Sequence, residues 1–275
     1  MPKKLLIHLG PPKTATTSLQ HWIYDNQNSY TYLGINQPRR PKDNIVYNKF
    51  WLFLNNKMTC KELIEFLENI KTKQVLIFSE EMILTDNWKN KLNRLAELKN
   101  HFDLHLAYCY RPTTKALPSY YAEIHSELPL AMKNSYELFL KDDRVGAYDL
   151  EKILDAITEK KLSLNIFKFE ELIKNTLTLN SVFNTSFKGF DFNKNIEISK
   201  ENSRKNKSGN IYEVIDKKPK YPTKLKSLLI KIEKKFNISF KGVFQKNYYI
   251  KIDSSVKVDE LSKKNKIFFK KYIDE

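Results

Sequence analysis

The feature that most constrains the fold is an apolar run near the start of the chain that ends in glycine and two prolines. Residues 4–9 are mostly apolar and are followed by turn residues at 10–12, which is typical of a buried strand that stops in a loop. Small hydroxyl residues at 14–18 then provide helix N-cap types, and apolar residues follow at helical spacing up to Ile23. The segment therefore predicts a strand, a loop and a helix in succession.

Further apolar runs over residues 75–78, 104–110 and 164–169 predict three more buried strands. Helical patterns lie between them, and the clearest is the amphipathic stripe over 150–157. Strands that alternate with helices predict a parallel sheet covered on both faces. We therefore expect an α/β protein, a P-loop-like three-layer fold with a central, mostly parallel sheet flanked by helices.

The length of 275 residues is near the upper size of one domain, so we expect a single domain over residues 1–275. Its core is expected over about residues 1–210. Residues 211–275 are expected to form a basic helical extension that packs on this core, with helices predicted at 225–232 and 261–272.

The cysteines and the hydropathy argue against several classes of protein. Cys60 and Cys109 have neither metal-ligand nor disulfide-scaffold spacing, which favours a reducing, cytoplasmic location. No apolar run approaches the roughly 18 residues of a membrane span, and the apolar start is too interrupted for a signal peptide. The five histidines are expected to be structural, with His8 in a buried strand.

The chain carries 48 lysines and arginines against 32 acidic residues, a formal net charge of +16. This excess predicts an anionic partner, such as nucleic acid, a phosphate-rich ligand, an acidic polysaccharide or an anionic membrane surface. A coding bias toward lysine explains the same excess without a partner, and both explanations stay open. Nucleic acid is not expected because basic and aromatic residues do not interleave as in known RNA-binding modules. The basic helix at 224–235 leaves peripheral membrane contact open.

The loop after the first strand carries the strongest signal for function. Backbone N–H groups at a helix N-terminus bind phosphate, and Lys13 and the hydroxyls at 14–18 add charge-assisted donors. The loop differs from a Walker A motif, which has a longer spacing and a glycine directly before the lysine. We therefore expect a single 5′-phosphate that bears a transferable group, rather than a nucleoside triphosphate with Mg²⁺.

Polar residues also follow the other predicted strands, at the edge where open α/β sheets bind ligands. Glu80 follows the second strand, Arg111 the third and Glu170 the fourth. Arg111 offers a guanidinium fork to phosphate oxygens, and Ser119, at the expected start of a helix, adds a hydroxyl donor. We expect the paired Arg111 and Ser119 to bind phosphate beside the first loop.

Together these motifs resemble those of sulfotransferases that use 3′-phosphoadenosine 5′-phosphosulfate (PAPS), over about residues 3–210. In that family a loop with Pro, Lys and paired Thr binds the 5′-phosphosulfate, and an Arg and a Ser after a later strand bind the 3′-phosphate. Supporting likenesses are found at Ser79-Glu80, Tyr148-Asp149 and 167–172. Phe169 stands where many members of the family have Tyr.

The resemblance implies that PAPS is held by the loop, by the Arg and Ser, and by a basic segment that closes over the nucleotide. The cofactor-binding residues implied are Pro12, Lys13, Thr14, Ala15, Thr16, Thr17, Ser18, Arg111, Ser119, Ser203, Arg204 and Lys205.

The resemblance also implies in-line transfer of a sulfuryl group from PAPS to a hydroxyl or amine of an acceptor, for which a carbohydrate is expected. Lys13 would stabilise the leaving 5′-phosphate, and no metal is expected. Glu80 is the expected base, with a partly buried carboxyl. Glu81 is the second choice, and we favour a solvated surface acid for it. Two alternatives stay open: a P-loop kinase or other nucleotide-binding enzyme, and a non-catalytic protein that binds anions or nucleic acid.

Overall fold

The computed structural model describes residues 2–35, 45–69, 72–198, 210–215, 247–253 and 255–274, with a few single positions between 225 and 232. Its central sheet has five strands in the order β2-β3-β1-β4-β5, and every neighbouring pair is parallel. The strands are β1 Lys4–His8, β2 Thr31–Tyr32, β3 Val75–Ser79, β4 Asp103–Tyr110 and β5 Ser163–Lys168. The four predicted strands and the α/β fold are confirmed, whereas the short β2 was not predicted.

Helices follow or precede each of these strands. They are α1 Thr16–Asp25, α2 Ile45–Leu54, α3 Cys60–Asn69, α4 Trp88–Leu98, α5 Thr113–Ile124, α6 Leu130–Lys133, α7 Tyr136–Phe139, α8 Leu150–Glu159, α9 Phe169–Ile173, α10 Leu179–Phe183, α11 Phe190–Asn193 and α14 Val256–Asp274. Short 3₁₀ helices lie at η1 Glu81–Leu84, η2 His125–Glu127 and η3 Asp143–Tyr148.

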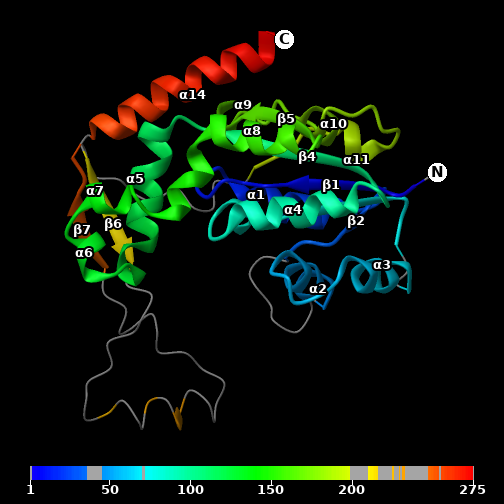
Figure 1. Ribbon diagram of the computed structural model, residues 1–275, viewed down its shortest axis with the longest axis horizontal. Coiled ribbons are helices and arrows are strands. Elements are labelled where there is room, and N and C mark those ends of the chain that lie inside the picture. The colour runs from blue at the N-terminus through cyan, green and yellow to red at the C-terminus, as the bar shows by residue number, and fades with distance from the viewer. Residues whose placement is uncertain are drawn as a thin grey trace.

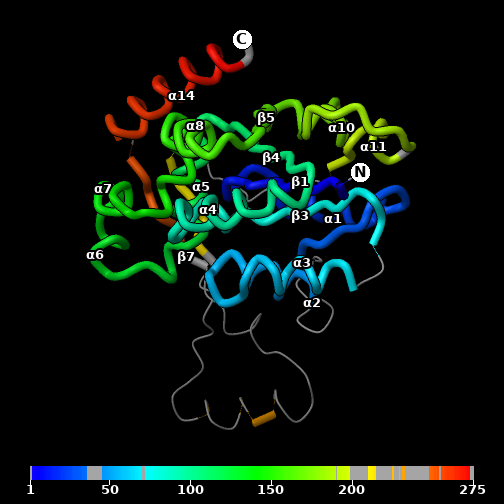
Figure 2. The backbone as a smooth tube through the Cα atoms, turned by 45° about the vertical axis from the view of Figure 1, so that its right-hand side comes forward, coloured from blue at the N-terminus to red at the C-terminus, as the bar shows by residue number. Residues whose placement is uncertain are grey.

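The helices cover both faces of the sheet, which gives three layers. Side chains alternate along β1, so that Leu5 and Ile7 pack in one apolar cluster and Leu6 packs in another on the opposite face. The first cluster includes residues of α3, α4 and α8, and the second includes residues of α1 and α10. Helices α2 and α3 lie on the side of the molecule away from α14 (Figure 1 and Figure 2).

Helix α5 begins at Thr113, with Pro112 as its N-cap, so the predicted start at Ser119 was wrong. Pro118 lies inside the helix, although an interior proline lacks an N–H donor and costs a helix about 3 kcal/mol. The helix continues because side chains around the proline are buried in the core, among them Leu117 and Tyr120. Tertiary burial here outweighs the local preference of the backbone.

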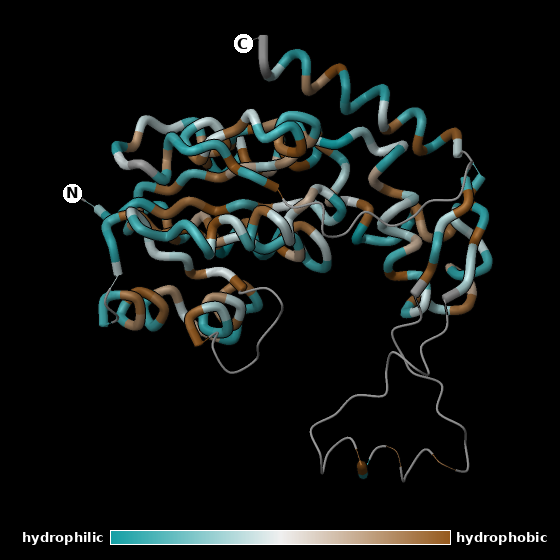
Figure 3. The backbone as a smooth tube through the Cα atoms, turned by 180° about the vertical axis from the view of Figure 1, so that it is seen from behind, coloured by the Kyte–Doolittle hydropathy of each residue, from teal (hydrophilic) through white to brown (hydrophobic). Residues whose placement is uncertain are grey.

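The C-terminal part of the chain packs against α5 and α8. Strands β6 Ile211–Ile215 and β7 Asn247–Lys251 form a second, antiparallel sheet that was not predicted. Helix α14 confirms and extends the helix predicted at 261–272, and the ring of Phe269 stacks on that of Tyr110 at 4.5 Å. Figure 3 shows apolar and polar residues alternating along α14, as expected of a helix with one packed face. Most of the helix predicted at 225–232 lies outside the described residues.

Candidate anion-binding and transfer site

The loop between β1 and α1 lies at the carboxyl ends of the central strands, with unusual backbone geometry. Gly10 has φ +90°, and a Cβ at this position would lie 2.8 Å from the Cα of Glu81. Lys13 and Ala15 are left-handed, with φ of 66° and 61°, and the intervening Thr14 is not. Alternation of hand is the backbone pattern of nests, whose N–H groups form a concave anion site. The loop is therefore suited to bind an anion through its backbone.

The sequence predicts that a hydroxyl side chain caps the N-terminus of α1, and this prediction was wrong. The N-cap residue is Ala15, and no side-chain cap hydrogen bond is formed. Thr14 Oγ1 instead donates to the carbonyl of Pro11 at 2.6 Å, which folds the loop back on itself. The first N–H groups of a helix lack intrahelical partners. Without a side-chain cap, they remain suited to an anionic group.

Arg111 follows β4 and contacts the loop directly. Its Nη1 donates to the carbonyl oxygen of Lys13 at 2.5 Å, and its guanidinium lies 4.4 Å from the centre of the Phe169 ring. Its Nε is buried and has no hydrogen-bond partner within the described part of the chain. Burial lowers the pKa of Arg111, and electrostatic attraction by Tyr148 and Glu170 opposes this shift. Arg111 thus joins two of the predicted motifs in one place.

Further contacts fix the loop to the body of the protein. Tyr148 Oη donates to the carbonyl of Pro12 at 2.8 Å, and the Tyr148 side chain is buried. The N–H of Cys109 donates to the carbonyl of Gly10 at 2.9 Å. Strand β4, η3 and Arg111 thus all donate hydrogen bonds to carbonyl groups of the loop, which ties it to three other parts of the chain.

Glu80 caps the 3₁₀ helix η1 immediately after β3. It is 1% exposed, so its burial exceeds the partial burial that we predicted. Oε1 accepts from the N–H of Met82 at 3.0 Å, and Oε2 accepts from Tyr47 Oη at 2.6 Å. Glu81 begins η1 and is half-buried, so it is not the fully solvated acid that we favoured. Both oxygens of Glu80 are thus already bonded.

Lys13, the predicted catalytic lysine, pairs with a carboxylate on α5. Its Nζ lies 3.4 Å from Oε2 of Glu123, and the two side chains are 19% and 34% exposed. Glu123 was not predicted as a site residue, because nothing in its local sequence distinguishes it from a surface acid. Only the packing of α5 beside the loop brings the two charges together.

The other predicted cofactor-binding residues differ in their burial and in their position on the helices. Thr16 and Ser18 are buried in the first turn of α1, and Thr17 is half-buried beside them. Ser119 is half-buried in the interior of α5, almost two turns after its first residue. The predicted basic segment, Ser203, Arg204 and Lys205, lies outside the described residues.

Two residues beside the site, Tyr47 and Tyr148, were not among the predicted site residues. Tyr47 lies on α2, far from any motif, and its bond to Glu80 depends on the packing of α2 against β3. Tyr148 was noted only for its likeness to the family, and its hydrogen bond to Pro12 could not be read from the sequence.

Two of the histidines, His8 and His125, lie in buried surroundings with side-chain partners. His8 in β1 is fully buried, and burial lowers its pKa to about 3. Its Nδ1 lies 3.0 Å from Ser79 Oγ. His125 lies in η2, just after α5, with Nδ1 2.8 Å from Tyr248 Oη and Nε2 3.1 Å from the carbonyl of Lys133.

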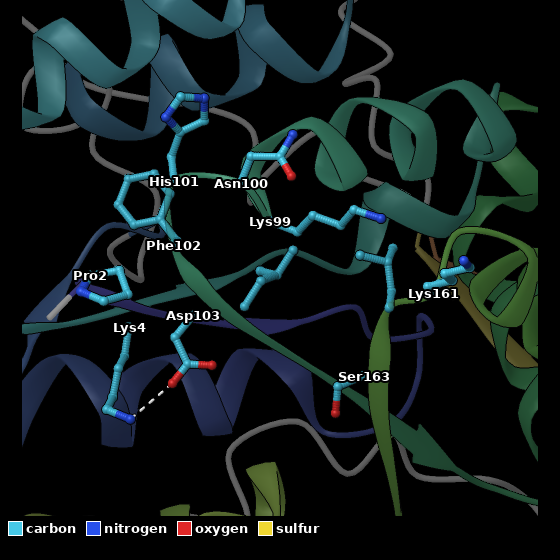
Figure 4. A pocket seen from close by; sticks show the side chains of 11 residues that line it. Pro2, Lys4, Lys99, Asn100, His101, Phe102, Asp103, Lys161 and Ser163 are labelled. Carbon is cyan, nitrogen blue, oxygen red and sulfur yellow. Dashed lines mark hydrogen bonds and ion pairs between the residues drawn. The ribbon is translucent and has the colours of Figure 1, made fainter.

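A cavity of about 510 Å³ lies at the opposite edge of the sheet, where β1, β4 and β5 begin (Figure 4). It is lined by Lys4, Asp103 and Ser163 among others, and Lys4 Nζ lies 2.9 Å from Asp103 Oδ2. Since the predicted site residues lie at the carboxyl ends of the strands, this cavity is separate from them.

The described residues contain neither a cluster of potential metal ligands nor a helix able to span a membrane. No group of three or more His, Cys, Asp or Glu side chains in these ranges is placed to hold a metal ion. Among the described helices, none combines the length and the apolar character needed to cross a membrane.

Comparison with known proteins does not add to this geometry. A scan against protein-family models found no match, and neither did searches of curated proteins and of solved structures.

Proposed function

We propose that the chain is a sulfotransferase that moves a sulfuryl group from PAPS to a hydroxyl or amine of an acceptor. The observation that carries the proposal is the direct bond between Arg111 and the loop carbonyl of Lys13. This bond joins the residue expected at the 3′-phosphate to the loop expected at the 5′-phosphosulfate.

The environment of Arg111 supports an anionic ligand. An arginine stays cationic in proteins, and a buried charge is costly unless it is paired and hydrogen-bonded. Among the described residues no carboxylate forms an ion pair with Arg111, and its Nε has no hydrogen-bond partner. A phosphate group at the guanidinium would supply the missing charge and acceptor.

The loop supports a phosphosulfate more than a triphosphate. Its spacing is shorter than that of a Walker A motif, and its left-handed residues and uncapped helix start suit one compact anionic group. The P-loop kinase remains the alternative enzyme, and it requires ATP with Mg²⁺.

The residues of the chain would act by positioning and by neutralising charge. Lys13 would face the oxygen that links the sulfuryl group to the 5′-phosphate, and the N–H groups from Thr14 to Ser18 would hold that phosphate. Glu80, the base expected from the sequence, already bonds Met82 and Tyr47 through its two oxygens. A carbohydrate remains the proposed acceptor.

The test is thermal stabilisation by 3′,5′-bisphosphoadenosine, compared with ATP and AMP, each with and without Mg²⁺. A ligand at 100 times its Kd adds about 2.7 kcal/mol to the free energy of unfolding. We expect a metal-independent shift with the bisphosphate, and its loss in Arg111→Ala. The matched control is Arg94→Ala, because Arg94 lies on α4 and binds Glu97 and backbone carbonyls away from the loop.

The other outcomes assign the alternatives. A shift only with ATP and Mg²⁺ would favour the kinase and contradict the sulfotransferase. No shift with any nucleotide, together with salt-dependent binding of anions or nucleic acid, would favour the non-catalytic protein.

A further inference from the structure

Arg111 and Phe169 lie side by side because of the register of the central sheet. Strands β4 and β5 are parallel, and Tyr110 of β4 lies opposite Lys168 of β5. Arg111 and Phe169 are the residues that come next in the chain after this pair. The guanidinium of Arg111 lies 4.4 Å from the centre of the Phe169 ring. The two side chains therefore meet at the carboxyl edge of the sheet, beside the loop that follows β1.

The ring contacts the cation without neutralising it. An aromatic ring attracts a guanidinium through its face and offers no carboxylate to its N–H groups. One N–H of Arg111, on Nη1, binds the carbonyl oxygen of Lys13 at 2.5 Å. Among the described residues no carboxylate forms an ion pair with Arg111. The positive charge thus stays available to an anion, which an acidic residue in place of Phe169 would prevent.

We propose that Phe169 is a positioning residue that fixes the guanidinium of Arg111 for the 3′-phosphate of the nucleotide. The inference rests on the proposed function, in which Arg111 binds this phosphate and the loop binds the 5′-phosphosulfate. An arginine side chain has several rotatable bonds, and fixing it before the ligand arrives reduces the entropy lost on binding. Phe169 thereby favours a nucleotide that carries a 3′-phosphate over one that lacks it.

Phe169 is suited to this role because the protein fixes its ring. It is the first residue of α9, directly after β5, and its half-buried side chain packs against the apolar cluster that contains Leu6 and residues of α1 and α10. Glu171 on the same helix pairs with Lys168 at 3.6 Å rather than with Arg111. The aromatic ring is therefore the fixed contact of the guanidinium on this side.

Isothermal titration calorimetry with 3′,5′-bisphosphoadenosine and with AMP tests the inference, because the two ligands differ only in the 3′-phosphate. We expect Phe169→Leu to weaken binding of the bisphosphate about tenfold, the loss expected for a partly desolvated cation–π contact. AMP should bind as tightly as to the natural protein, because Tyr148 and Cys109 still bond the loop. Phe169→Tyr keeps the ring and should keep both affinities.

The matched control is Phe187→Leu. Phe187 packs against the same apolar cluster, and its ring centre lies 4.7 Å from Nζ of Lys4, at the edge of the sheet where β1 begins. This variant should leave the affinity for both ligands unchanged. In the background of Arg111→Ala, Phe169→Leu should cause no further loss of bisphosphate binding, because the ring acts through the guanidinium alone.

Three results would overturn the inference. The first is an unchanged affinity of Phe169→Leu for the bisphosphate. The second is an equal weakening of AMP and the bisphosphate, because the ring would then act on the adenosine or on the loop. The third is a further loss when Phe169→Leu is added to Arg111→Ala.

The natural protein and Arg111→Ala separate this inference from the proposed function. If the natural protein does not bind the bisphosphate more tightly than AMP, the proposed function fails, and the role of Phe169 fails with it. If Arg111→Ala removes this preference while Phe169→Leu keeps it, only the role of Phe169 fails.

Discussion

At the scale of single residues, Gly10 has the strictest steric requirement in the loop. Its φ of +90° is a conformation that residues with a Cβ rarely adopt, and the space at its Cα is filled by the backbone of Glu81. Ala15 also has a left-handed backbone, with φ 61°, although it carries a Cβ. This φ lies in the small left-handed region that residues with a Cβ can adopt. An alanine at position 10 should therefore destabilise the protein, whereas the alanine at position 15 is tolerated.

We predict that Gly10→Ala destabilises the protein by roughly 2 kcal/mol or more, because strain at positive φ adds to a backbone clash. Urea unfolding followed by circular dichroism would measure the loss. Ala15→Gly is the matched control and should cost little, because relief of left-handed strain offsets the entropy lost by glycine. Equal losses in the two variants would contradict the geometry described for Gly10.

At the scale of elements, α14 is joined to the site through Asn265 and Tyr148. The Asn265 side chain is buried, its Nδ2 donates to the carbonyl of Tyr148 at 2.6 Å, and its Oδ1 accepts from Leu150 N–H at 3.1 Å. Tyr148 in turn holds Pro12. A helix close to the end of the chain thus supports the loop that follows the first strand.

We predict that Asn265→Ala lowers the free energy of unfolding by about 2–3 kcal/mol, because it leaves buried backbone groups of Tyr148 and Leu150 unpaired. Chemical denaturation would measure the change, with exposed Lys266→Ala on the same helix as the control. A loss no larger than that of the control would show that α14 does not support η3.

At the scale of the whole molecule, the net charge of +16 is the dominant property. Like charges repel one another in the compact state, and dissolved salt screens this repulsion. The site nevertheless contains carboxylates beside its cations, since Glu123 pairs with Lys13. The global charge therefore favours the approach of anions, whereas local pairing determines which cationic groups an approaching anion would meet.

We predict that the melting temperature rises between about 10 mM and about 150 mM NaCl, over which the Debye length falls from about 30 Å to about 8 Å. Differential scanning fluorimetry would measure it in the absence of nucleotide. A constant or falling melting temperature would mean that local ion pairs, rather than net repulsion, govern the salt response.

The strands and the site loop were predictable because each depends on local sequence. A buried strand needs a short apolar run, and a phosphate-type loop needs its glycine, lysine and hydroxyls in consecutive positions. Residues 4–9 and Gly10 to Ser18 satisfy both requirements. The start of α5 was not predictable in the same way, because burial of its side chains overrides the local effect of Pro118.

The partners of the site residues were decided by tertiary structure alone. Lys13 and Glu123 are far apart in the sequence, and they meet only because α5 packs beside the loop. Tyr47 meets Glu80, and Asn265 meets Tyr148, for the same reason. Local patterns determine which elements form and which chemical groups they carry. The pairing of distant charges and hydrogen bonds depends on the packing of whole layers, which no short segment of sequence encodes.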